Sequence, residues 1–333
     1  MRNVPTILVL LAAGLLAAGC GSSSSEGEVT GGSTAAPAEA SAAADFPDAK
    51  GKRLSELREG LQGGLVLAPS VSVIDPGETR YGFALFDTAR KQITGAPVAL
   101  YISKPDGTAV RGPFAARSAS LAVKPQYQAV STKADPDAGT SIYVADIEFP
   151  SAGKYRVSAI AELDGRLVST SSFGAAVVSG NEGEPPLVGE LAPRIHTPTL
   201  ADVAGDAERI STRSPPAEDL LKTDFADVYG KKPVLLLFAT PALCASRTCG
   251  PVVDILEQVR AEYGKDDVAF IHNEIYRENR VDQGLRPEPA KFRIPTEPWL
   301  FVIGRDGRIV QRIEGAFSAR EAEKAIETAR AAD

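Results

Sequence analysis

Residues 234–254 read VLLLFATPALCASRTCGPVVD, and this stretch combines an apolar run, a turn with two cysteines and the start of a helix. The continuous apolar run at 234–238 is typical of a strand that is buried on both faces. Apolar side chains at helical spacing over residues 252–263 predict a helix after Cys249. The N-terminus of a helix has unpaired N–H groups and partial positive charge, and both stabilise a thiolate. We therefore expect Cys244 and Cys249 to carry thiolate chemistry at this strand–helix junction.

Strands and helices alternate in the sequence that follows. The expected elements are a strand at 268–276, a short helix at 288–293, a strand at 299–304, a tight turn at 305–308 into a hairpin partner, and a final helix that ends near residue 332. Ser318 and Glu321 match the capping box that begins a helix. The order after the first strand is therefore helix, strand, helix, hairpin and helix.

With two cysteines after the first strand and a proline before the third, this order resembles the thioredoxin fold. The segment PWLFVI at 298–303, followed by RDGRI at 305–309, is similar to a segment of the membrane-tethered TlpA-like envelope thioredoxins. The resemblance covers about residues 187–333 and implies an α/β thioredoxin-like fold with a redox-active disulfide and no other cofactor. It also implies that Pro298 is a cis proline that faces the thiols, with Pro295 as the second choice.

The cysteine spacing departs from that family, whose members usually carry Cys-x-x-Cys. Here four residues separate Cys244 from Cys249. Five residues advance about 7.5 Å along a regular helix, which exceeds the usual Cα separation of a disulfide, about 4.4–6.8 Å. We therefore expect Cys244 in the turn before the helix and Cys249 in or beside its first turn, where a disulfide is feasible.

We assign the two cysteines different roles in thiol–disulfide exchange. Cys244, nearer the exposed end of the turn, is the expected nucleophile, and Cys249 is the resolving thiol. Arg247 lies between them and would lower the pKa of a thiol by its positive charge, unless it is a solvated surface side chain. The pair is alternatively a structural staple, although so short a loop constrains the unfolded chain little.

Three further residues are expected to support the pair. Envelope thioredoxins often keep an acidic group beneath the thiols, and because the strand at 234–238 contains none, Glu274 is the expected substitute. Alternation places His272 on the same face of its strand, where it is alternatively a core histidine bonded to the backbone. Trp299, the only tryptophan, is expected beside the disulfide or, alternatively, in the core.

Two other functions stay open. A copper metallochaperone similar to the Sco type would bind Cu(I) through two sulfurs and one nitrogen, supplied by Cys244, Cys249 and His272. A thiol peroxidase would use Cys244 as its reactive thiol. Thr240 and Pro241 precede that cysteine loosely as in peroxiredoxins, although the full motif of that family is absent.

The preceding part of the chain consists of short alternating runs separated by turn signals. The expected strands are 65–74, 81–87, 97–103, 142–149, 154–162, 166–172 and 173–179. Seven strands without a long helix favour an all-β immunoglobulin-like sandwich. Tyr155 resembles the corner tyrosine of that fold, whose hydroxyl bonds back to the chain, and is alternatively a plain strand aromatic. The apolar residues of 111–140 follow neither the helical nor the strand period, and we expect this segment to form a long loop with at most one strand.

The N-terminus predicts export. Arg2 precedes an apolar run at 4–16, and small residues lead from there to Cys20. This pattern resembles the lipobox of bacterial lipoproteins, with Cys20 as the lipidated residue, although Ala17 stands where leucine is more usual. The alternative is an ordinary cleaved signal peptide. The apolar run is too short to form a membrane-spanning helix.

Composition divides the chain into five parts. They are a lipoprotein signal peptide at 1–20, a disordered tether at 21–58, the immunoglobulin-like sandwich at 59–180, a linker at 181–186 and the thioredoxin-like domain at 187–333. A net charge of -7 without clustered basic side chains argues against nucleic acid as a partner. We therefore predict a thiol–disulfide oxidoreductase that is lipid-anchored to the cell membrane outside the cytoplasm. Its expected partners are exported thiol or disulfide proteins and a membrane electron donor or acceptor.

Overall fold

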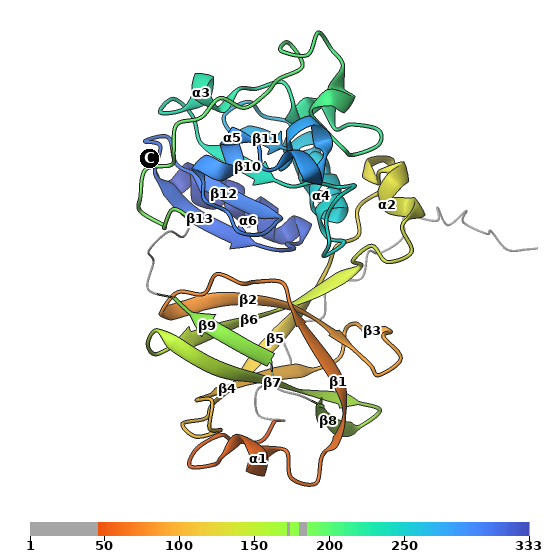
Figure 1. Cartoon of the computed structure of the whole chain (residues 1–333), viewed down its shortest axis with the longest axis vertical. Helices are drawn as coiled ribbons and strands as arrows, with labels where there is room; N and C mark the ends of the chain where they lie inside the picture. Colours follow the sequence, from red (N-terminus) through yellow and green to blue (C-terminus); the bar gives the residue numbers. More distant parts are fainter. Residues whose placement is uncertain (1–45, 172–173, 180–184, 333) are drawn as a thin grey trace, which may run out of the picture. The chain divides into compact units, whose positions relative to one another are not determined.

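Two β-sheets make up most of the structure, a computed structural model that describes residues 46–171, 174–179 and 185–332 (Figure 1). The described residues belong to one compact unit. Cys20, the predicted signal peptide and the predicted tether up to residue 45 lie outside them, as do residues 181–184 of the predicted linker. None of the helices in the described ranges has the length and hydropathy that crossing a bilayer requires.

The first sheet contains nine strands and closes on itself. The strands are β1 (Gln62–Pro69), β2 (Gly77–Phe86), β3 (Gln92–Ile93), β4 (Val98–Ser103), β5 (Arg111–Ser120), β6 (Ser141–Phe149), β7 (Gly153–Leu163), β8 (Arg166–Thr170) and β9 (Gly174–Val178). The order β1-β8-β7-β4-β5-β6-β2 returns to β1, because β1 also pairs with β2, and these seven strands form a barrel. β1 and β8 are parallel, whereas the other pairs in the ring are antiparallel.

Large apolar side chains fill the barrel. Tyr81 and Phe83 of β2 and Tyr143 of β6 are buried in its interior, and the rings of Phe83 and Tyr143 stack with their centroids 5.5 Å apart. The opposite face of β4 is buried as well, because the short helix α1 (Leu54–Leu57) packs against Tyr101. The barrel interior is therefore a packed core, as in other small barrels.

The predicted immunoglobulin-like sandwich is wrong. Each of the seven predicted strands overlaps an observed strand, but β5 occupies residues that were expected to be mostly loop and pairs with both β4 and β6. With β5 between them, and with β1 bonded to both β2 and β8, the strands form one closed ring rather than two facing sheets. The Tyr155 hydroxyl does donate to Ser151 O at 2.9 Å, so this corner contact also occurs in a barrel.

The second sheet has four strands in the order β11-β10-β12-β13. Its strands are β10 (Val234–Phe238), β11 (Ala269–Asn273), β12 (Trp299–Ile303) and β13 (Ile309–Glu314). β10 is parallel to β11 and antiparallel to β12, and β13 is antiparallel to β12. The other helices are α2 (Val130–Ala134), α3 (Phe225–Val228), α4 (Cys249–Tyr263), α5 (Pro287–Lys291) and α6 (Ala319–Ala331), with 3-10 turns at Pro125–Tyr127, Ala207–Arg209, Glu218–Leu220, Arg277–Asn279 and Val281–Gln283.

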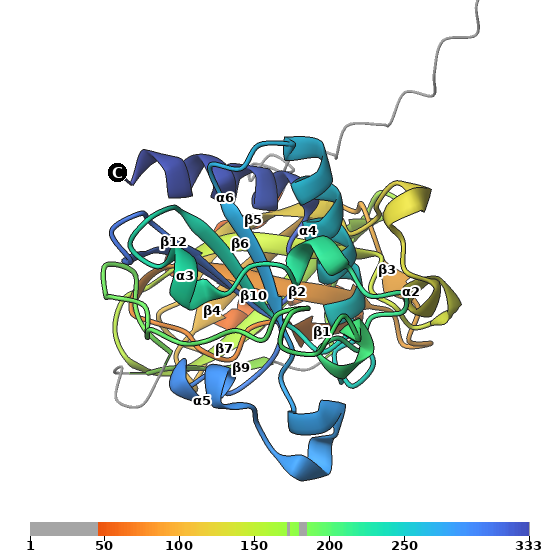
Figure 2. The same cartoon turned by 90° about the horizontal axis from the view of Figure 1, so that it is seen from above.

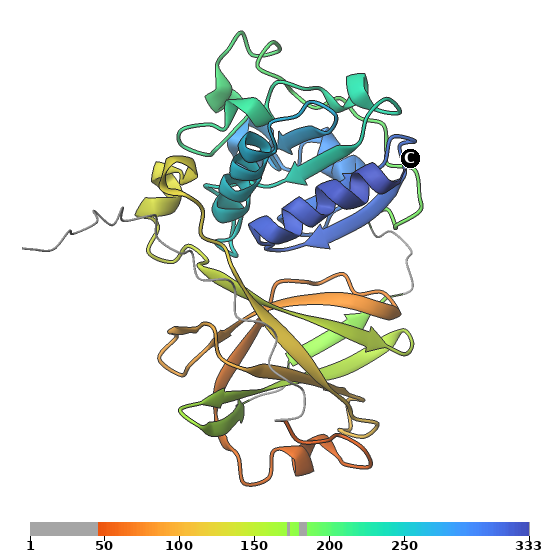
Figure 3. The same ribbon diagram turned by 180° about the vertical axis from the view of Figure 1, so that it is seen from behind.

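The two faces of this sheet are covered differently. α4 and α6 lie side by side over one face, where they bury Leu235 and Leu237 of β10 (Figures 2 and 3). α6 begins at the predicted capping box, since Ser318 Oγ accepts from Glu321 N at 3.3 Å. The other face, with Phe238 and Phe301, is covered by Phe292 and by side chains from loops and single helical turns.

The predicted α/β thioredoxin-like fold is contradicted as well. The strands and helices expected after residue 234 are present at their predicted positions. However, the described chain is mostly β, a closed seven-stranded barrel plus a second sheet with few helices. One physical reason is that α4 and α6 cover only one face of the second sheet, while loops cover the other face. A sequence period identifies single elements, but it does not show what covers each face of a sheet.

Candidate functional site

The two cysteines meet where β10 leads into α4. Cys244 and Cys249 are joined as a disulfide with their Cα atoms 5.9 Å apart, inside the range that a disulfide spans. Cys244 lies in the turn of residues 239–248, which we call the cysteine turn, and Cys249 is the first residue of α4. The expected placement of both cysteines is therefore confirmed. Both are buried, with 5% of Cys244 and none of Cys249 exposed, so Cys244 is the more accessible sulfur.

Hydroxyl groups line the cysteine turn on the side of Cys244. Ser246 Oγ lies 3.2 Å from Cys244 Sγ and 2.9 Å from Thr248 Oγ1. The sequence prediction did not include Ser246, although a serine two residues after a cysteine is the signal that would have suggested it. Thr248 precedes α4 without capping it by its side chain, and no acidic residue occupies the first turn of the helix. The N-terminus of α4 therefore offers its partial positive charge to the sulfur of Cys249.

The side chain of Arg247 pairs with a carboxylate rather than with the sulfurs. Its side chain is 55% exposed, and its Nη1 lies 3.3 Å from Asp135 Oδ2. Its backbone has φ of +56°, a left-handed conformation that residues with a Cβ rarely adopt. The observed role of Arg247 is thus to shape the turn and to pair with Asp135.

Glu274 is buried and supports the cysteine turn through an intermediate. Its Oε1 accepts from Thr212 N at 2.6 Å and from Thr212 Oγ1 at 2.7 Å. Thr212 Oγ1 in turn accepts from Ala242 N, in the cysteine turn, at 3.1 Å. Glu274 Oε2 is buried without a hydrogen-bond partner. The predicted acidic group is therefore coupled to the turn, through a threonine that the sequence did not identify.

His272 is a buried histidine bonded to the backbone, as the alternative interpretation expected. Its Nε2 lies 3.0 Å from Ala239 O, so this nitrogen carries the hydrogen, and its Nδ1 has no partner. Burial lowers the pKa of His272 below its ordinary value of 6.5, against the opposing charge of Glu274. Across the described ranges, no three His, Cys, Asp or Glu side chains are arranged to hold a metal ion. Cys244, Cys249 and His272, the ligands of the alternative copper site, do not form such a group in this structure.

The structure separates Trp299 from the cysteines. Trp299 belongs to the core on the loop-covered face of the sheet, whereas Cys244 and Cys249 belong to the core under α4 and α6. Its indole stacks on Phe301 with the ring centroids 5.6 Å apart. The expectation that the tryptophan lies beside the disulfide is therefore not met, and the core alternative describes it.

Pro298 precedes β12 and is buried. The Glu297–Pro298 bond is cis, as the resemblance implied, and Pro295 is not in a cis bond. Phe238, the last residue of β10, pairs with Trp299, the first residue of β12. Pro298 therefore lies opposite Ala239, where the cysteine turn begins.

A segment of the barrel covers the cysteine turn. Residues 121–140, which connect β5 to β6 and contain α2, lie against α4, and we call them the cover (Figures 1 and 3). Gly139 N donates to Arg247 O at 3.0 Å. A cavity of about 320 Å³ lies between the cover and the turn, with Thr132, Asp135, Pro241 and Arg247 among its lining residues.

A buried ion pair, which the sequence did not predict, ties the cover to α4. Arg213 and Asp254 are almost completely buried, and Arg213 Nε donates to Asp254 Oδ1 at 2.7 Å. Arg213 Nη2 also donates to Tyr127 O, and Ala129 N donates to Asp254 Oδ2 at 3.1 Å. The signal for this pair is a carboxylate inside the apolar run PVVDIL at 251–256.

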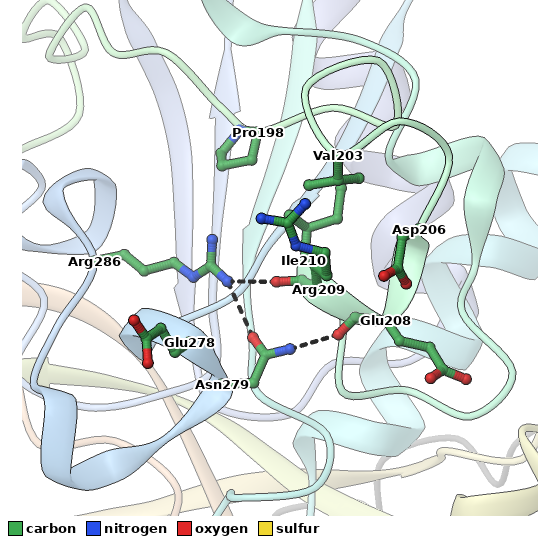
Figure 4. A pocket seen from close by; sticks show the side chains of 9 residues that line it. All are labelled: Pro198, Val203, Asp206, Glu208, Arg209, Ile210, Glu278, Asn279 and Arg286. Atoms are coloured by element: carbon green, nitrogen blue, oxygen red, sulfur yellow. Dashed lines mark hydrogen bonds between the residues drawn. The ribbon is translucent and has the colours of Figure 1, made fainter.

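A larger cavity, about 750 Å³, lies elsewhere in the same sheet region (Figure 4). Arg286 crosses it, donating Nε to Tyr276 O at 3.0 Å and Nη2 to Arg209 O at 3.1 Å and Asn279 Oδ1 at 3.0 Å. The remaining lining residues are Pro198, Val203, Asp206, Glu208, Ile210 and Glu278. This cavity shares no lining residue with the cavity beside the cysteine turn, so its size does not identify it as the redox site.

The chain matches no protein-family model, and no curated protein is similar to it. The resemblance to envelope thioredoxins therefore stays a prediction, and any functional assignment depends on the geometry of the cysteine pair.

Proposed function

We propose that the chain is a thiol–disulfide oxidoreductase with Cys244 and Cys249 as its redox pair. The observation that carries this proposal is the disulfide at the N-terminus of α4, with its Cα atoms 5.9 Å apart. A disulfide between residues five positions apart closes a short loop and stabilises the fold little, so stabilisation alone is a weak explanation for the pair. The sulfurs also lie where a helix end stabilises a thiolate.

In the oxidised state, a partner thiolate attacks Cys244 Sγ, the more exposed of the two sulfurs. A bond forms between the partner and Cys244 while the Cys244–Cys249 bond breaks, and Cys249 leaves as a thiolate. The N-terminus of α4 stabilises that charge. A second partner thiolate then attacks the partner sulfur of the mixed disulfide, which releases an oxidised partner and the Cys244 thiolate. The reverse sequence reduces a partner disulfide.

Glu274 and Thr212 are positioning residues in this scheme. Thr212 Oγ1 accepts a hydrogen bond from Ala242 N. The backbone N–H and the hydroxyl of Thr212 in turn donate to the buried carboxyl group of Glu274. Hydrogen bonds to charged groups are stronger than neutral ones, so this chain fixes the start of the cysteine turn. A fixed turn keeps Cys244 within reach of Cys249.

The location and partners of the proposed enzyme follow from the sequence. The predicted export signal and Cys20 support a lipid-anchored protein outside the cytoplasm. Disulfides persist in such oxidising compartments, whereas cytosolic thiols are kept reduced. The proposed partners are thus exported proteins with thiols or disulfides, and a membrane electron donor or acceptor.

The test is turnover of a disulfide substrate by single-cysteine variants. Cys244→Ser should abolish turnover without trapping a partner, because the attacking sulfur is gone. Cys249→Ser should instead accumulate a mixed disulfide on Cys244, visible as a mass increase that dithiothreitol reverses. Ala245→Ser, which adds a hydroxyl at an exposed position of the same turn, serves as the matched control and should keep full turnover.

Undiminished turnover in both cysteine variants would exclude the proposal. Absence of turnover in the unaltered chain, together with a lower free energy of unfolding in both variants, would favour the structural staple instead.

A further inference from the structure

The cover makes two distinct sets of contacts. Its first part, residues 121–131, bonds to the body of α4 and to the segment before β10. Its second part, residues 132–140, bonds to the cysteine turn, except that Thr140 at its end donates to Gln92 Oε1 at 3.1 Å and accepts from Leu121 N at 3.0 Å. We call these the anchored half and the turn-facing half of the cover.

The anchored half is held by groups that do not belong to the cysteine turn. Lys124 N donates to Gln258 Oε1 at 2.7 Å, and Ala129 N donates to Asp254 Oδ2 at 3.1 Å. Tyr127 O accepts from the buried guanidinium of Arg213 at 2.7 Å. A change in the cysteine turn leaves all of these partners in place.

The turn-facing half depends on the cysteine turn itself. Gly139 N donates to Arg247 O at 3.0 Å, and Asp135 pairs with the Arg247 side chain at 3.3 Å. A Cβ built on Gly139 would lie 3.2 Å from the Thr248 methyl group, and one on Gly250 would lie 2.8 Å from Thr132 Oγ1. These close approaches show that the turn-facing half lies directly on the residues between and beside the two cysteines.

The conformation of Arg247 links these contacts to the disulfide. Its φ of +56° is unfavourable for a residue with a Cβ, so the surrounding structure must hold it there. The disulfide closes the chain around Arg247, from Cys244 to Cys249. Once the two sulfurs separate, Arg247 is free to return to a common backbone conformation. Its carbonyl and guanidinium, which hold Gly139 and Asp135, then move with it.

We propose that the turn-facing half of the cover is closed on the oxidised cysteine turn and is released when the Cys244–Cys249 bond is reduced, while the anchored half stays in place. This inference rests on the proposed function, because it requires the pair to change its redox state. Reduction consumes two electrons and two protons, which dithiothreitol supplies as it closes into its own cyclic disulfide.

Release of the turn-facing half would change access to the sulfurs. The cavity of about 320 Å³ beside the turn is lined by Thr132, Ala134, Asp135 and Ala138 of this half, so it opens when they move. The reduced thiols are then exposed to a partner disulfide, and the disulfide that forms on Cys244 and Cys249 is covered again. The barrel thereby gains a role at the redox site through its cover.

Hydrogen exchange of the full chain, resolved by mass spectrometry, tests this proposal. Exchange in residues 132–140, including the Gly139 N–H, should rise by roughly tenfold or more on reduction, because opening no longer breaks contacts with the turn. Residues 122–131 should exchange at an unchanged rate, whereas the N–H of Leu121 donates to Thr140 O and is counted with the turn-facing half. Trypsin provides a second readout for the turn-facing half, since cleavage after Lys133 should increase on reduction.

Variants separate the cover from the chemistry. A chain with both Cys244→Ser and Cys249→Ser should show the open pattern with or without dithiothreitol. Asp135→Asn removes the pairing with Arg247 and should raise exchange of the turn-facing half several-fold in the oxidised chain alone. Asp137→Asn, an exposed neighbour in the same segment, is the matched control and should change nothing.

Equal protection of residues 132–140 in the oxidised chain and in the double serine variant would overturn the proposal, and so would equal loosening of both halves. Either result leaves the proposed function intact if Cys249→Ser still traps a mixed disulfide. Conversely, a chain that opens on reduction but never exchanges disulfides with a partner would retain the cover and lose the proposed function.

Discussion

The barrel and the second sheet region differ in what they bury. The buried polar side chains of the barrel strands are serines and threonines, such as the Ser158–Thr170 pair, whose hydroxyl oxygens lie 2.9 Å apart. The described residues from 185 onward bury charged side chains as well, among them Arg213, Asp254 and Glu274. The barrel core otherwise consists of apolar and aromatic side chains.

This difference agrees with the proposed function, in which the second sheet region carries the chemistry and the barrel supports it. Burying a charge costs several kcal/mol unless it is paired, so a fold that serves only as support avoids it. In this chain the buried charged groups include those that hold the cysteine turn and the cover, while the barrel contributes its cover and the apolar side chains of Ile142 and Val144 to the same region.

The largest expected effect is the loss of the buried ion pair. Arg213→Ala leaves Asp254 buried and uncompensated, which should lower the free energy of unfolding by about 3–5 kcal/mol. Ser158→Ala in the barrel should cost only about 1 kcal/mol, because it removes one neutral hydrogen bond. Urea denaturation of both variants measures the difference. Similar losses in the two regions would contradict the comparison.

The loss in Arg213→Ala should depend on pH. Burial raises the pKa of Asp254, and the charge of Arg213 opposes that rise, so the variant raises this pKa further. A carboxyl group with a raised pKa binds protons more tightly in the folded state, and its folded state gains stability as the pH falls. The deficit of the variant relative to the unaltered chain should therefore shrink between pH 7 and pH 5. A deficit that grows in this window would show that Asp254 is not the group left uncompensated.

The next effect concerns the contact between β2 of the barrel and α6. Arg80 Nε donates to Glu321 Oε1 at 2.8 Å, and Nη2 donates to Oε2 at 3.1 Å. Burial raises the pKa of Glu321, but the charge and hydrogen bonds of Arg80 outweigh it, so the pKa lies below its ordinary value of 4.5. This pair therefore stabilises the fold above about pH 4.5, and its contribution is lost as the pH falls through the lowered pKa.

Glu321→Gln should lower the free energy of unfolding at pH 7 by about 1.5–3 kcal/mol, the value of hydrogen bonds to a charged group. It should also flatten the acid side of the stability profile, because the titrating carboxyl is absent. Glu323→Gln is the matched control, because Glu323 lies two residues further along α6, is exposed and does not pair with Arg80. An unchanged acid profile in Glu321→Gln would contradict the assignment of this pair as a stabilising contact between the two regions.

A smaller effect tests the fit between the cover and α4. Gly250→Ala normally favours a helix by up to about 1 kcal/mol, but here the new Cβ would meet Thr132 Oγ1 at 2.8 Å. We expect a net loss of about 1–3 kcal/mol, as for other overpacked contacts. In a Thr132→Ala background the same substitution should instead be neutral or stabilising. A double-mutant cycle by thermal unfolding measures this change of sign, and additive effects would show that the two residues do not touch.

The fold of the barrel could be predicted only in part. Seven of its strands have visible alternation, but β5 reads RGPFAARSAS, in which small side chains and a proline weaken the period. That strand decides the topology, since it joins β4 to β6. Closure of the barrel depends on pairing between segments that are distant in sequence, such as β1 and β8. Local sequence patterns do not predict such pairing.

The positions of the two cysteines were predicted better, because they depend on elements that are local in sequence. The cysteines lie five positions apart, and their junction with a strand and a helix is readable from apolar runs and helical spacing. Thr212, which bonds to the cysteine turn, and Arg213, which bonds to α4 and the cover, come from a loop before β10 and reach these partners only through the fold. Trp299 illustrates the same limit, since strand alternation does not say which face of the sheet holds the cysteines.

The smallest expected effect returns to the barrel. Tyr155→Phe removes the hydroxyl that donates to Ser151 O at 2.9 Å, while the ring stays packed edge-on against Phe149 with centroids 5.2 Å apart. Ser151 is exposed, so its carbonyl can bond to water in the variant, and the loss should lie near the lower end of about 0.5–1.5 kcal/mol. Urea denaturation alongside Arg213→Ala provides the measurement. A loss as large as that of the ion pair would mean that the barrel also depends on particular polar contacts, and the division into scaffold and chemical site would fail.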